Sequence, residues 1–343
     1  MSDKILTVIV PSYNMEKYLP KCLGSLIVAT ELMERVEVIV VNDGSTDRTS
    51  EIAHGFAANY PQTFKVIDKP NGHYGSCVNA GLKVATGQYV KTLDADDTFE
   101  SNEFTVWLKG LANLDKLCDV IFTDYVQVNE QNAVTAKVSL KLPTNREVDT
   151  DFLDRWGYIA MHAIAYRLGL LKEISYRQTE GVAYTDTEWA CRPLAHARSC
   201  FYFPIVVYRY LLGREGQSAD PVVVSKSGAQ MATVARNLAD RFAKDRQNLS
   251  MPARAFYARS VQRVCLMAYN VYLLNAPISS SDGPLVDFDC YLREILPEIR
   301  AQVLQSRIPR QYGIAYIRVW LRYPWLRHFL LHVIRTYLSL RKV

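Results

Sequence analysis

The chain has 343 residues, of which 49% are hydrophobic and 22% charged, and a formal net charge of +5 without internal repeats or low-complexity tracts. At this length we expect about two domains. The seven cysteines are odd in number and lack CxxC spacing, so neither a zinc site nor a disulfide framework is indicated, and the pattern fits a reducing cytosol. The first residues lead directly into a predicted strand, so we expect no secretory signal and a cytoplasmic location.

The first two predicted strands end in polar, turn-forming loops. The β-branched run 5–10 leads into Pro11-Ser-Tyr-Asn14, and the run 36–42 leads into Asp43-Gly-Ser-Thr-Asp47. The polar residues at 45–47 are candidate N-caps for a helix through 51–53. Asp43 would then lie at a strand's carboxyl end, where open α/β sheets bind ligands. Alternatively, Asp43 braces its own turn.

A third unit continues the pattern. The run 64–67 leads into Lys69-Pro-Asn-Gly-His-Tyr-Gly75, and a helical pattern over 78–85 ends near Gly87. Asn71, Gly72 and Gly75 are turn residues here, and the same loop offers them as ligand contacts.

The fourth unit carries three carboxylates at its end, Asp94, Asp96 and Asp97. On an extended backbone residues two apart share a face, so we expect Asp94 and Asp96 to address one ligand while Ala95 keeps the turn uncrowded. Hard oxygen ligands suit Mg²⁺ or Mn²⁺ holding a diphosphate. In isolation, the same residues would read as an acidic turn that caps the next helix.

A second acidic site follows in the middle of the chain. Asp186 and Glu188 open an apolar helical pattern with Trp189 and Leu194. A helix N-terminus favours an ionised carboxylate. Alone, this pattern would indicate a helix N-cap with an acidic first turn.

Residues 5–100 resemble the nucleotide-sugar half of a family 2 glycosyltransferase with the GT-A fold. The matching motifs are Val10-Pro-Ser-Tyr-Asn14, Val41-Asn-Asp-Gly-Ser-Thr-Asp47, Asn71-Gly-His-Tyr-Gly75, Asn79-Ala-Gly81 and the DxD element Asp94-Ala-Asp96-Asp97. Asn42 departs from the family, which often has a second Asp there. The resemblance implies an α/β chain: a GT-A nucleotide-sugar-binding sheet flanked by helices, followed by a helical carboxyl-terminal region.

The resemblance also implies roles for the matching residues. Asp43 would accept the imide N–H of uracil or thymine, which adenine and cytosine lack at that position, and Tyr13 would pack near the base. Asp96 and Asp94 would hold Mn²⁺ or Mg²⁺, and Asp186 would be the base that deprotonates the acceptor hydroxyl. The implied donor-binding residues are Pro11, Tyr13, Asn14, Asp43, Asn71, Gly72, Gly75, Asn79, Asp94 and Ala95.

Two further stretches match the family less specifically. Residues 156–167 resemble a segment that lines the acceptor side, where His162, Arg167 and, from the later motif, Glu188 are candidates. A core position is the alternative for His162. Residues 213–218 are similar to a loop that closes over the donor diphosphate, with Arg214 as its phosphate ligand or as a solvated cation.

The carboxyl third loses its strand patterns. We expect a catalytic domain over residues 1–220, with a donor half of about 1–100 and an acceptor half of about 101–220, then helices at 227–244, 252–274 and 285–305 in a helical region over 221–306. The tail 307–343 carries eight basic residues and no acid, so all of the net positive charge lies there.

Apolar and aromatic residues alternate with the arginines of this tail. The pattern is typical of an interfacial amphipathic helix that contacts anionic lipid, and its arginines are too frequent for a membrane crossing. The alternative is a helical hairpin packed on its own core or in a homo-oligomer. No recognition motif accompanies the charge, so nucleic acid is not expected.

These features favour an inverting, metal-dependent transferase that moves a sugar from a pyrimidine diphosphate donor, UDP above all, to a hydroxyl of a glycan or lipid-linked acceptor in surface polysaccharide assembly. The cytoplasmic protein would lie peripherally on the inner face of the membrane. The alternative function is a catalytically silent sugar-nucleotide-binding partner subunit. The loop after the first strand lacks the GxGxxG of dinucleotide enzymes and the Gly-rich basic loop of nucleotidyltransferases.

Overall fold

The computed structural model describes residues 4–214, 216–217, 229–275, 282–307, 313–326, 329–330, 332–334 and 336. The chain divides into two compact units, Met1–Gln217 and Ser218–Val343. Each unit is described by itself.

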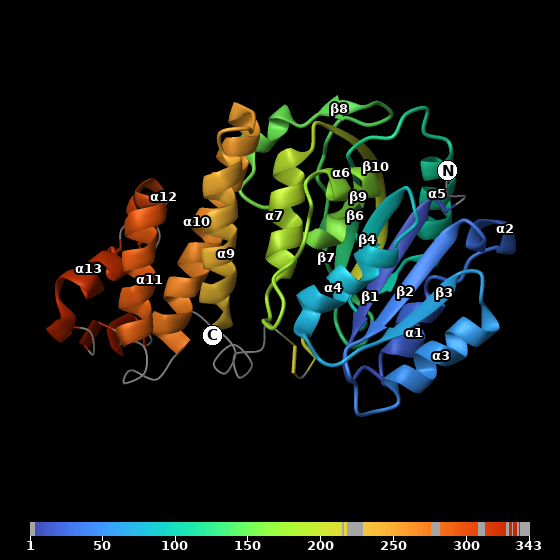
Figure 1. The fold of residues 1–343 in the computed structure, drawn as a ribbon, viewed down its shortest axis with the longest axis horizontal. Helices are drawn as coiled ribbons and strands as arrows, with labels where there is room; N and C mark the ends of the chain where they lie inside the picture. Colours follow the sequence, from blue (N-terminus) through green and yellow to red (C-terminus); the bar gives the residue numbers. More distant parts are fainter. Residues whose placement is uncertain are drawn as a thin grey trace. The chain divides into compact units, whose positions relative to one another are not determined.

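The described strands of the first unit form one ten-stranded sheet in the order β3-β2-β1-β4-β9-β6-β10-β5, in which β7 also pairs with β6 and β8 with β10 (Figure 1). The strands are β1 Leu6–Ser12, β2 Val36–Asn42, β3 Phe64–Asp68, β4 Tyr89–Thr92, β5 Thr98–Phe99, β6 Val120–Val128, β7 Val134–Val138, β8 Val148–Asp149, β9 Ile164–Arg167 and β10 Ser199–Leu211.

The first four strands are parallel to one another. β1 pairs with β2 and β4, and β2 pairs with β3. Every residue of β1, β2 and β4 is buried, as expected of apolar strands that are covered on both faces. Because their carboxyl ends meet at one edge, the four polar loops predicted from the sequence lie along that edge. The expected α/β fold is confirmed.

Helices connect these strands. In the first unit they are α1 Leu19–Gly24, α2 Thr30–Met33, α3 Thr49–Asn59, α4 His73–Val84, α5 Ser101–Ala112, α6 Leu168–Glu173 and α7 Asp186–His196, with 3₁₀ turns at Asp151–Arg155 and Met161–Ala163. The prediction of an N-cap at 45–47 was wrong by a small margin. Arg48 is the N-cap of α3, and Asp47 Oδ1 instead accepts the N–H of Thr49, the first helical residue, at 3.0 Å.

The second half of the sheet is mixed. β9 runs antiparallel to β4 and β6, whereas β10 runs parallel to β6. The β10–β6 register shifts between Phe203 and Val206 and again before Tyr208. Pro204 lies inside this irregular stretch, and a proline cannot donate to the strand ladder. Beyond the irregular stretch, β10 reaches β5 and the loop that follows β4.

A buried lysine joins the two halves. Lys91 of β4 is fully buried and its Nζ donates to the carbonyls of His162 at 2.7 Å and Ile164 at 3.1 Å. The same ammonium lies 5.4 Å from the ring centroid of Tyr208. Burial lowers the pKa of Lys91 to about 7. These contacts tie β4 to the start of β9 from inside the sheet.

The second unit is helical in its described residues. It contains α9 Gln230–Asp245, α10 Met251–Asn270 with a π-turn at Val271–Asn275, α11 Asp282–Ile295, α12 Pro297–Val303, α13 Tyr316–Arg322 and a 3₁₀ turn at Pro324–Leu326. The single helix predicted at 285–305 is two helices, because Pro297 lacks an N–H and begins α12 in its first turn. None of the helices in the described ranges is both long and apolar enough to span a membrane.

Gly87 offers a test of the packing between β1 and β4. A Cβ at Gly87 would lie 2.5 Å from Thr7 N and 2.7 Å from Leu6 C, which are backbone atoms that cannot yield alone. We expect Gly87→Ala to lower the free energy of unfolding by about 1–3 kcal/mol, measured by urea denaturation. As a matched control, Gly55→Ala in α3 meets nothing within 4 Å and should gain about 0.5–1 kcal/mol. Equal stabilities for the two variants would contradict this account.

Candidate active site

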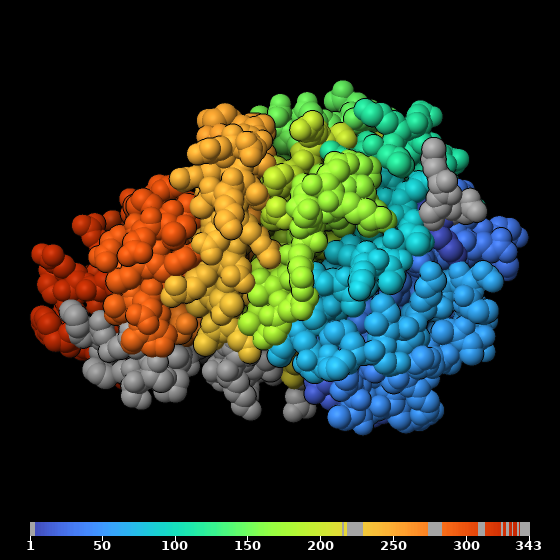
Figure 2. All heavy atoms as spheres, viewed as in Figure 1, coloured from blue at the N-terminus to red at the C-terminus, as the bar shows by residue number. Residues whose placement is uncertain are grey.

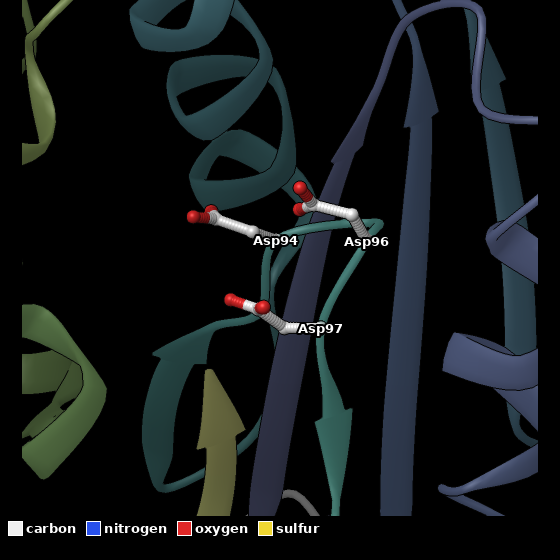
Figure 3. A group of neighbouring side chains, drawn as sticks. All are labelled: Asp94, Asp96 and Asp97. Atoms are coloured by element: carbon white, nitrogen blue, oxygen red, sulfur yellow. The ribbon is translucent and has the colours of Figure 1, made fainter. Parts of the chain in front are cut away.

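Three carboxylates gather in the turn after β4. Asp94, Asp96 and Asp97 each offer an oxygen, and these oxygens lie within 4.8 Å of one another; the three side chains point to one side of the turn (Figure 3). The expectation that an extended backbone aligns Asp94 with Asp96 was wrong. The N–H of Asp97 donates to Asp94 O at 2.9 Å, and this turn, rather than strand alternation, brings the side chains together.

β10 supplies the donors that hold Asp97. Tyr208 Oη donates to Asp97 Oδ2 at 2.6 Å, and the N–H of Leu211 donates to Asp97 Oδ1 at 2.7 Å. The N–H of Asp94 also donates to Tyr208 Oη, at 3.2 Å. Burial and the neighbouring carboxylates raise the pKa of Asp97 well above its usual range. Both oxygens of Asp97 are therefore engaged by the protein.

Asp94 faces the middle of the site. Tyr74 Oη, from α4, donates to Asp94 Oδ1 at 3.0 Å. Burial, and then the charges of Asp96 and Asp186, raise the pKa of Asp94 to about 7. A divalent cation would relieve this crowding of negative charge.

Asp96 pairs with the arginine predicted to bind phosphate. Arg214 Nε donates to Asp96 Oδ2 at 2.5 Å, and both side chains are largely buried, with 13% and 11% of their surfaces exposed. The guanidinium of Arg214 also lies over the ring of Tyr18, 5.4 Å from its centroid. The structure thus brings Arg214 to the acidic turn.

The acidic turn fits a hard divalent metal. Tyr208 and Leu211 engage both oxygens of Asp97, whereas Tyr74 and Arg214 each engage one oxygen of Asp94 and Asp96, respectively, which makes these two the better candidates to hold an ion. Mg²⁺ and Mn²⁺ sites with diphosphates usually take one or two protein carboxylates and fill the remaining positions with water and phosphate. The carboxylates best placed to bind a metal are therefore the predicted pair, Asp94 and Asp96.

Asp43 lies at the end of β2, as expected, and is almost fully buried. Its Oδ1 accepts from Lys69 Nζ at 2.5 Å and from the N–H of Gly72 at 3.0 Å. Both bonds cross to the loop after β3, so Asp43 braces that loop rather than its own turn. Tyr13, by contrast, is 47% exposed beside the end of β1.

The remaining residues of the predicted donor site differ in their surroundings. Asn14 Oδ1 accepts the N–H of Thr46 at 2.9 Å, which joins the loops after β1 and β2. The side chain of Asn71 is exposed, whereas Pro11 and Ala95 are buried. Asn14 thus connects neighbouring loops along the ligand-binding edge.

Gly72, Gly75 and Asn79 have a structural explanation that the sequence motifs did not indicate. Gly72 O accepts from Gly181 N at 2.9 Å, and a Cβ at Gly75 would lie 2.0 Å from Thr179 O. Asn79 Nδ2 donates to Gln178 O and to Glu180 Oε1, while its Oδ1 accepts from Gln178 N. All amide positions of Asn79 are used, so the prediction that Gly75 and Asn79 contact the donor is replaced by a bracing role for the segment 178–181.

The predicted acceptor contact of Glu188 is also corrected. Glu188 is fully buried, and its carboxylate accepts from the N–H and the Oγ1 of Thr179, both at 2.7 Å. A buried and paired carboxylate cannot contact an acceptor. Glu188 instead anchors the segment 178–181 from its other side. Figure 2 shows this segment against α4 on the surface of the first unit.

Asp186 is the first residue of α7 and lies beyond this braced segment. Burial is the main cause that raises the pKa values of Asp94, Tyr74 and Tyr210, and the charge of Asp186 adds to it. The predicted base therefore lies within electrostatic reach of the acidic turn.

The predictions that His162 and Arg167 contact the acceptor are corrected by the structure. The ring of His162 is buried among the rings of Tyr125, Tyr208 and Tyr210, with a centroid distance of 4.2 Å to Tyr210. Burial and the Lys91 ammonium lower the pKa of His162 to about 3.

Arg167 forms ion pairs with Asp119 at 2.7 Å and Glu173 at 3.0 Å. These pairs occupy its guanidinium at the end of β9. His162 and Arg167 therefore belong to the framework of the fold.

Three site residues were missed by sequence reasoning: Tyr74, Lys69 and Tyr208. Tyr74 and Lys69 stand inside the loop motif that was identified, next to residues that were selected. Tyr208 stands in an aromatic strand with no local sign of its distant partner.

The brace on residues 178–181 is open to a direct test. Asn79→Ala removes three hydrogen bonds, each worth about 0.5–1.5 kcal/mol. We expect amide hydrogen exchange over residues 178–185 to accelerate by at least about tenfold, while the strands β1 and β2 keep their protection. Asn59→Ala, at the exposed end of α3, is the control. Unchanged exchange in Asn79→Ala would refute the bracing role.

Comparison with known proteins places part of the chain in a family. Residues 7–174 match the model of the family described as Glycosyl transferase family 2. The chain is 28% identical over 228 residues to the uncharacterized glycosyltransferase YibD of Escherichia coli, covering 62% of each chain. It is 32% identical over 132 residues to the chondroitin synthase of Pasteurella multocida, covering 38% of this chain and 13% of that one. The matches thus span less than two thirds of either relative's own length.

A solved structure resembles the whole chain. Residues 1–349 of S. aureus TarS, in complex with UDP-GlcNAc, superpose with a TM-score of 0.64 at 19% identity, covering 98% of this chain and 92% of that one. At this identity the likeness establishes the fold. The family match identifies residues 7–174 as a glycosyl transferase family 2 domain, and the fold is of the GT-A type.

Proposed function

We propose that the protein is an inverting, metal-dependent glycosyltransferase that uses a pyrimidine diphosphate sugar, UDP above all. The observation that carries the proposal is the cluster of three carboxylates in the turn after β4, with Asp186, at the start of α7, within electrostatic reach of Asp94. These two features lie far apart in sequence, and a transfer reaction needs both a base and a stabilised leaving group at one point. The complex of TarS with UDP-GlcNAc supports the choice of UDP.

The nucleotide would bind along the edge formed by the loops after β1, β2 and β3. Asp43, buried and already aligned by Lys69 and Gly72, would accept the imide N–H of the base. The exposed ring of Tyr13 would pack beside the base. The diphosphate would then reach the acidic turn.

Asp94 and Asp96 would hold Mn²⁺ or Mg²⁺ at that turn. The ion, when bound, neutralises negative charge on the diphosphate, which contributes several kcal/mol to leaving-group stabilisation. Asp97, held by Tyr208 and Leu211, fixes the conformation of the turn. Tyr74 orients the carboxylate of Asp94.

Asp186 would take the proton of the acceptor hydroxyl. The hydroxyl oxygen then forms a bond to the anomeric carbon, and the bond from that carbon to the diphosphate oxygen breaks on the opposite face, which inverts the configuration. The brace formed by Gly72, Asn79 and Glu188 would hold the segment before Asp186 in place during this step. The acceptor is proposed to be a glycan or a lipid-linked glycan of a surface polysaccharide, in line with the relationship to chondroitin synthase.

Asp186→Asn tests the base. We expect transfer and donor hydrolysis to fall by about 10² to 10⁴-fold, while UDP-sugar binding in the presence of Mn²⁺, measured by calorimetry, stays unchanged. A panel of UDP- and dTDP-sugars would identify the donor first. Asp151→Asn is a matched control because Asp151 also begins a short helix but is exposed. Wild-type turnover in Asp186→Asn would exclude Asp186 as the base.

The tail would place the enzyme at a lipid-linked acceptor. Within the described residues, Tyr316, Ile317 and Trp320 are buried, whereas Trp325 is 76% and Phe329 68% exposed. Arg310, Arg327, Arg335, Arg341 and Lys342 lie outside the described residues. Exposed aromatic side chains next to basic residues suit the interface of an anionic membrane.

A flotation assay tests this contact. We expect the protein to float with vesicles that contain phosphatidylglycerol and to be released at high salt. The double variant Trp325→Ser and Phe329→Ser should bind at least about tenfold more weakly, because two aromatic side chains lose their burial in lipid. Val106→Ser in α5 is the control, since Val106 is also exposed, at 53%. Equal flotation of the double variant would refute membrane docking through these residues.

A further inference from the structure

The ion pair between Arg214 and Asp96 places a cation of the protein at the acidic turn. Arg214 Nε lies 2.5 Å from Asp96 Oδ2, and both side chains are nearly buried. Asp96 is one of the two proposed metal ligands. The guanidinium therefore engages an oxygen that an ion at this turn could also bind.

Electrostatics explains why an arginine lies here. Asp94, Asp96 and Asp97 lie within one turn, and the charge of Asp186, at the start of α7, acts on Asp94. In a largely buried site, like charges at such distances repel strongly. The guanidinium of Arg214 offsets part of this repulsion and lowers the pKa of Asp94 against the larger effect of burial.

Arg214 and a divalent cation would compete for Asp96 Oδ2. An oxygen that accepts a short hydrogen bond from Nε has its lone pair directed at the guanidinium. In addition, a second positive charge at the turn would be repelled by the first. Metal binding through Asp96 Oδ2 therefore requires the guanidinium to leave that oxygen.

A diphosphate would give the displaced guanidinium a new partner. Arginine binds phosphate oxygens with paired N–H donors, and such bonds are stronger than neutral ones. Tyr18, whose ring already lies under Arg214, keeps the side chain beside the turn.

We propose that Arg214 is a resident cation that competes with the divalent metal for Asp96 and transfers to the donor diphosphate when metal and donor bind together. This inference rests on the proposed function, because it concerns the same metal and the same class of donor. It adds a coupling between them: the metal releases Arg214, and the released Arg214 strengthens diphosphate binding. A metal without a diphosphate pays the cost of displacing Arg214, so metal alone binds weakly.

The proposal predicts effects of opposite sign from one substitution. In Arg214→Gln, we expect Mn²⁺ to bind the protein without nucleotide about tenfold more tightly than it binds the wild type. At saturating Mn²⁺, we expect UDP to bind the same variant about tenfold more weakly. Arg214→Lys keeps the charge but loses the planar fork. Its affinities for Mn²⁺ and for UDP should therefore lie between those of the wild type and those of Arg214→Gln.

Mn²⁺ binding is measured by electron paramagnetic resonance of the free ion and UDP binding by calorimetry, both on the full chain. Arg209→Gln is the matched control, since Arg209 is similarly buried, at 16% exposed, but pairs with Glu100 at 3.0 Å. It should change neither affinity. A thermal melt of each variant identifies any loss of folding, and Arg214→Lys provides the test if the glutamine variant is unstable.

The outcomes separate this inference from the proposed function. If Arg214→Gln binds Mn²⁺ no more tightly than the wild type does, competition is overturned while the metal site stands. If both affinities fall, Arg214 serves only to hold the turn, and the inference is again overturned. If neither protein binds Mn²⁺ with or without UDP, the metal dependence of the proposed function fails as well.

Discussion

The concentration of carboxylates after β4 is the constraint on which the rest of the site depends. Negative side chains this close and this buried are unstable unless donors or cations satisfy them. The protein provides Tyr208 and the N–H of Leu211 for Asp97, and Tyr74 for Asp94. Because these donors come from β10 and α4, the acidic turn requires both halves of the sheet to be in place.

The amino-terminal part of α4 meets a second requirement, the placement of Asp186. Within the described residues, no strand leads directly into Asp186, and the segment before it is instead held by side contacts. Asn79 uses its whole amide on this segment, and Gly75 allows the backbones to approach closely. The loop motif that resembles a donor-binding element therefore also connects the nucleotide edge with the base.

Arg209 and Arg214 are both largely buried, but their ion-pair partners differ in proposed role. Arg209 pairs with Glu100, a residue with no role in the proposed chemistry. Arg214 pairs with Asp96, a proposed metal ligand. Two arginines with similar burial thus have different roles. An arginine that neutralises a metal site before the metal binds would make metal occupancy depend on the nucleotide-sugar donor.

The sequence by itself determined the strands and the polar loops at their carboxyl ends, and it predicts Asp43, Asp94, Asp96 and Asp186 as site residues. Strand burial and turn formation follow from local patterns, because hydrophobic periodicity and turn residues act over a few positions. Only the tertiary structure decided that a turn aligns the carboxylates, that Asn79 and Glu188 brace a segment, that His162 lies among aromatic rings, and that Arg214 meets Asp96. Each of those outcomes depends on a partner distant in sequence, and a side chain's partner is set by how whole elements pack rather than by its neighbours along the chain.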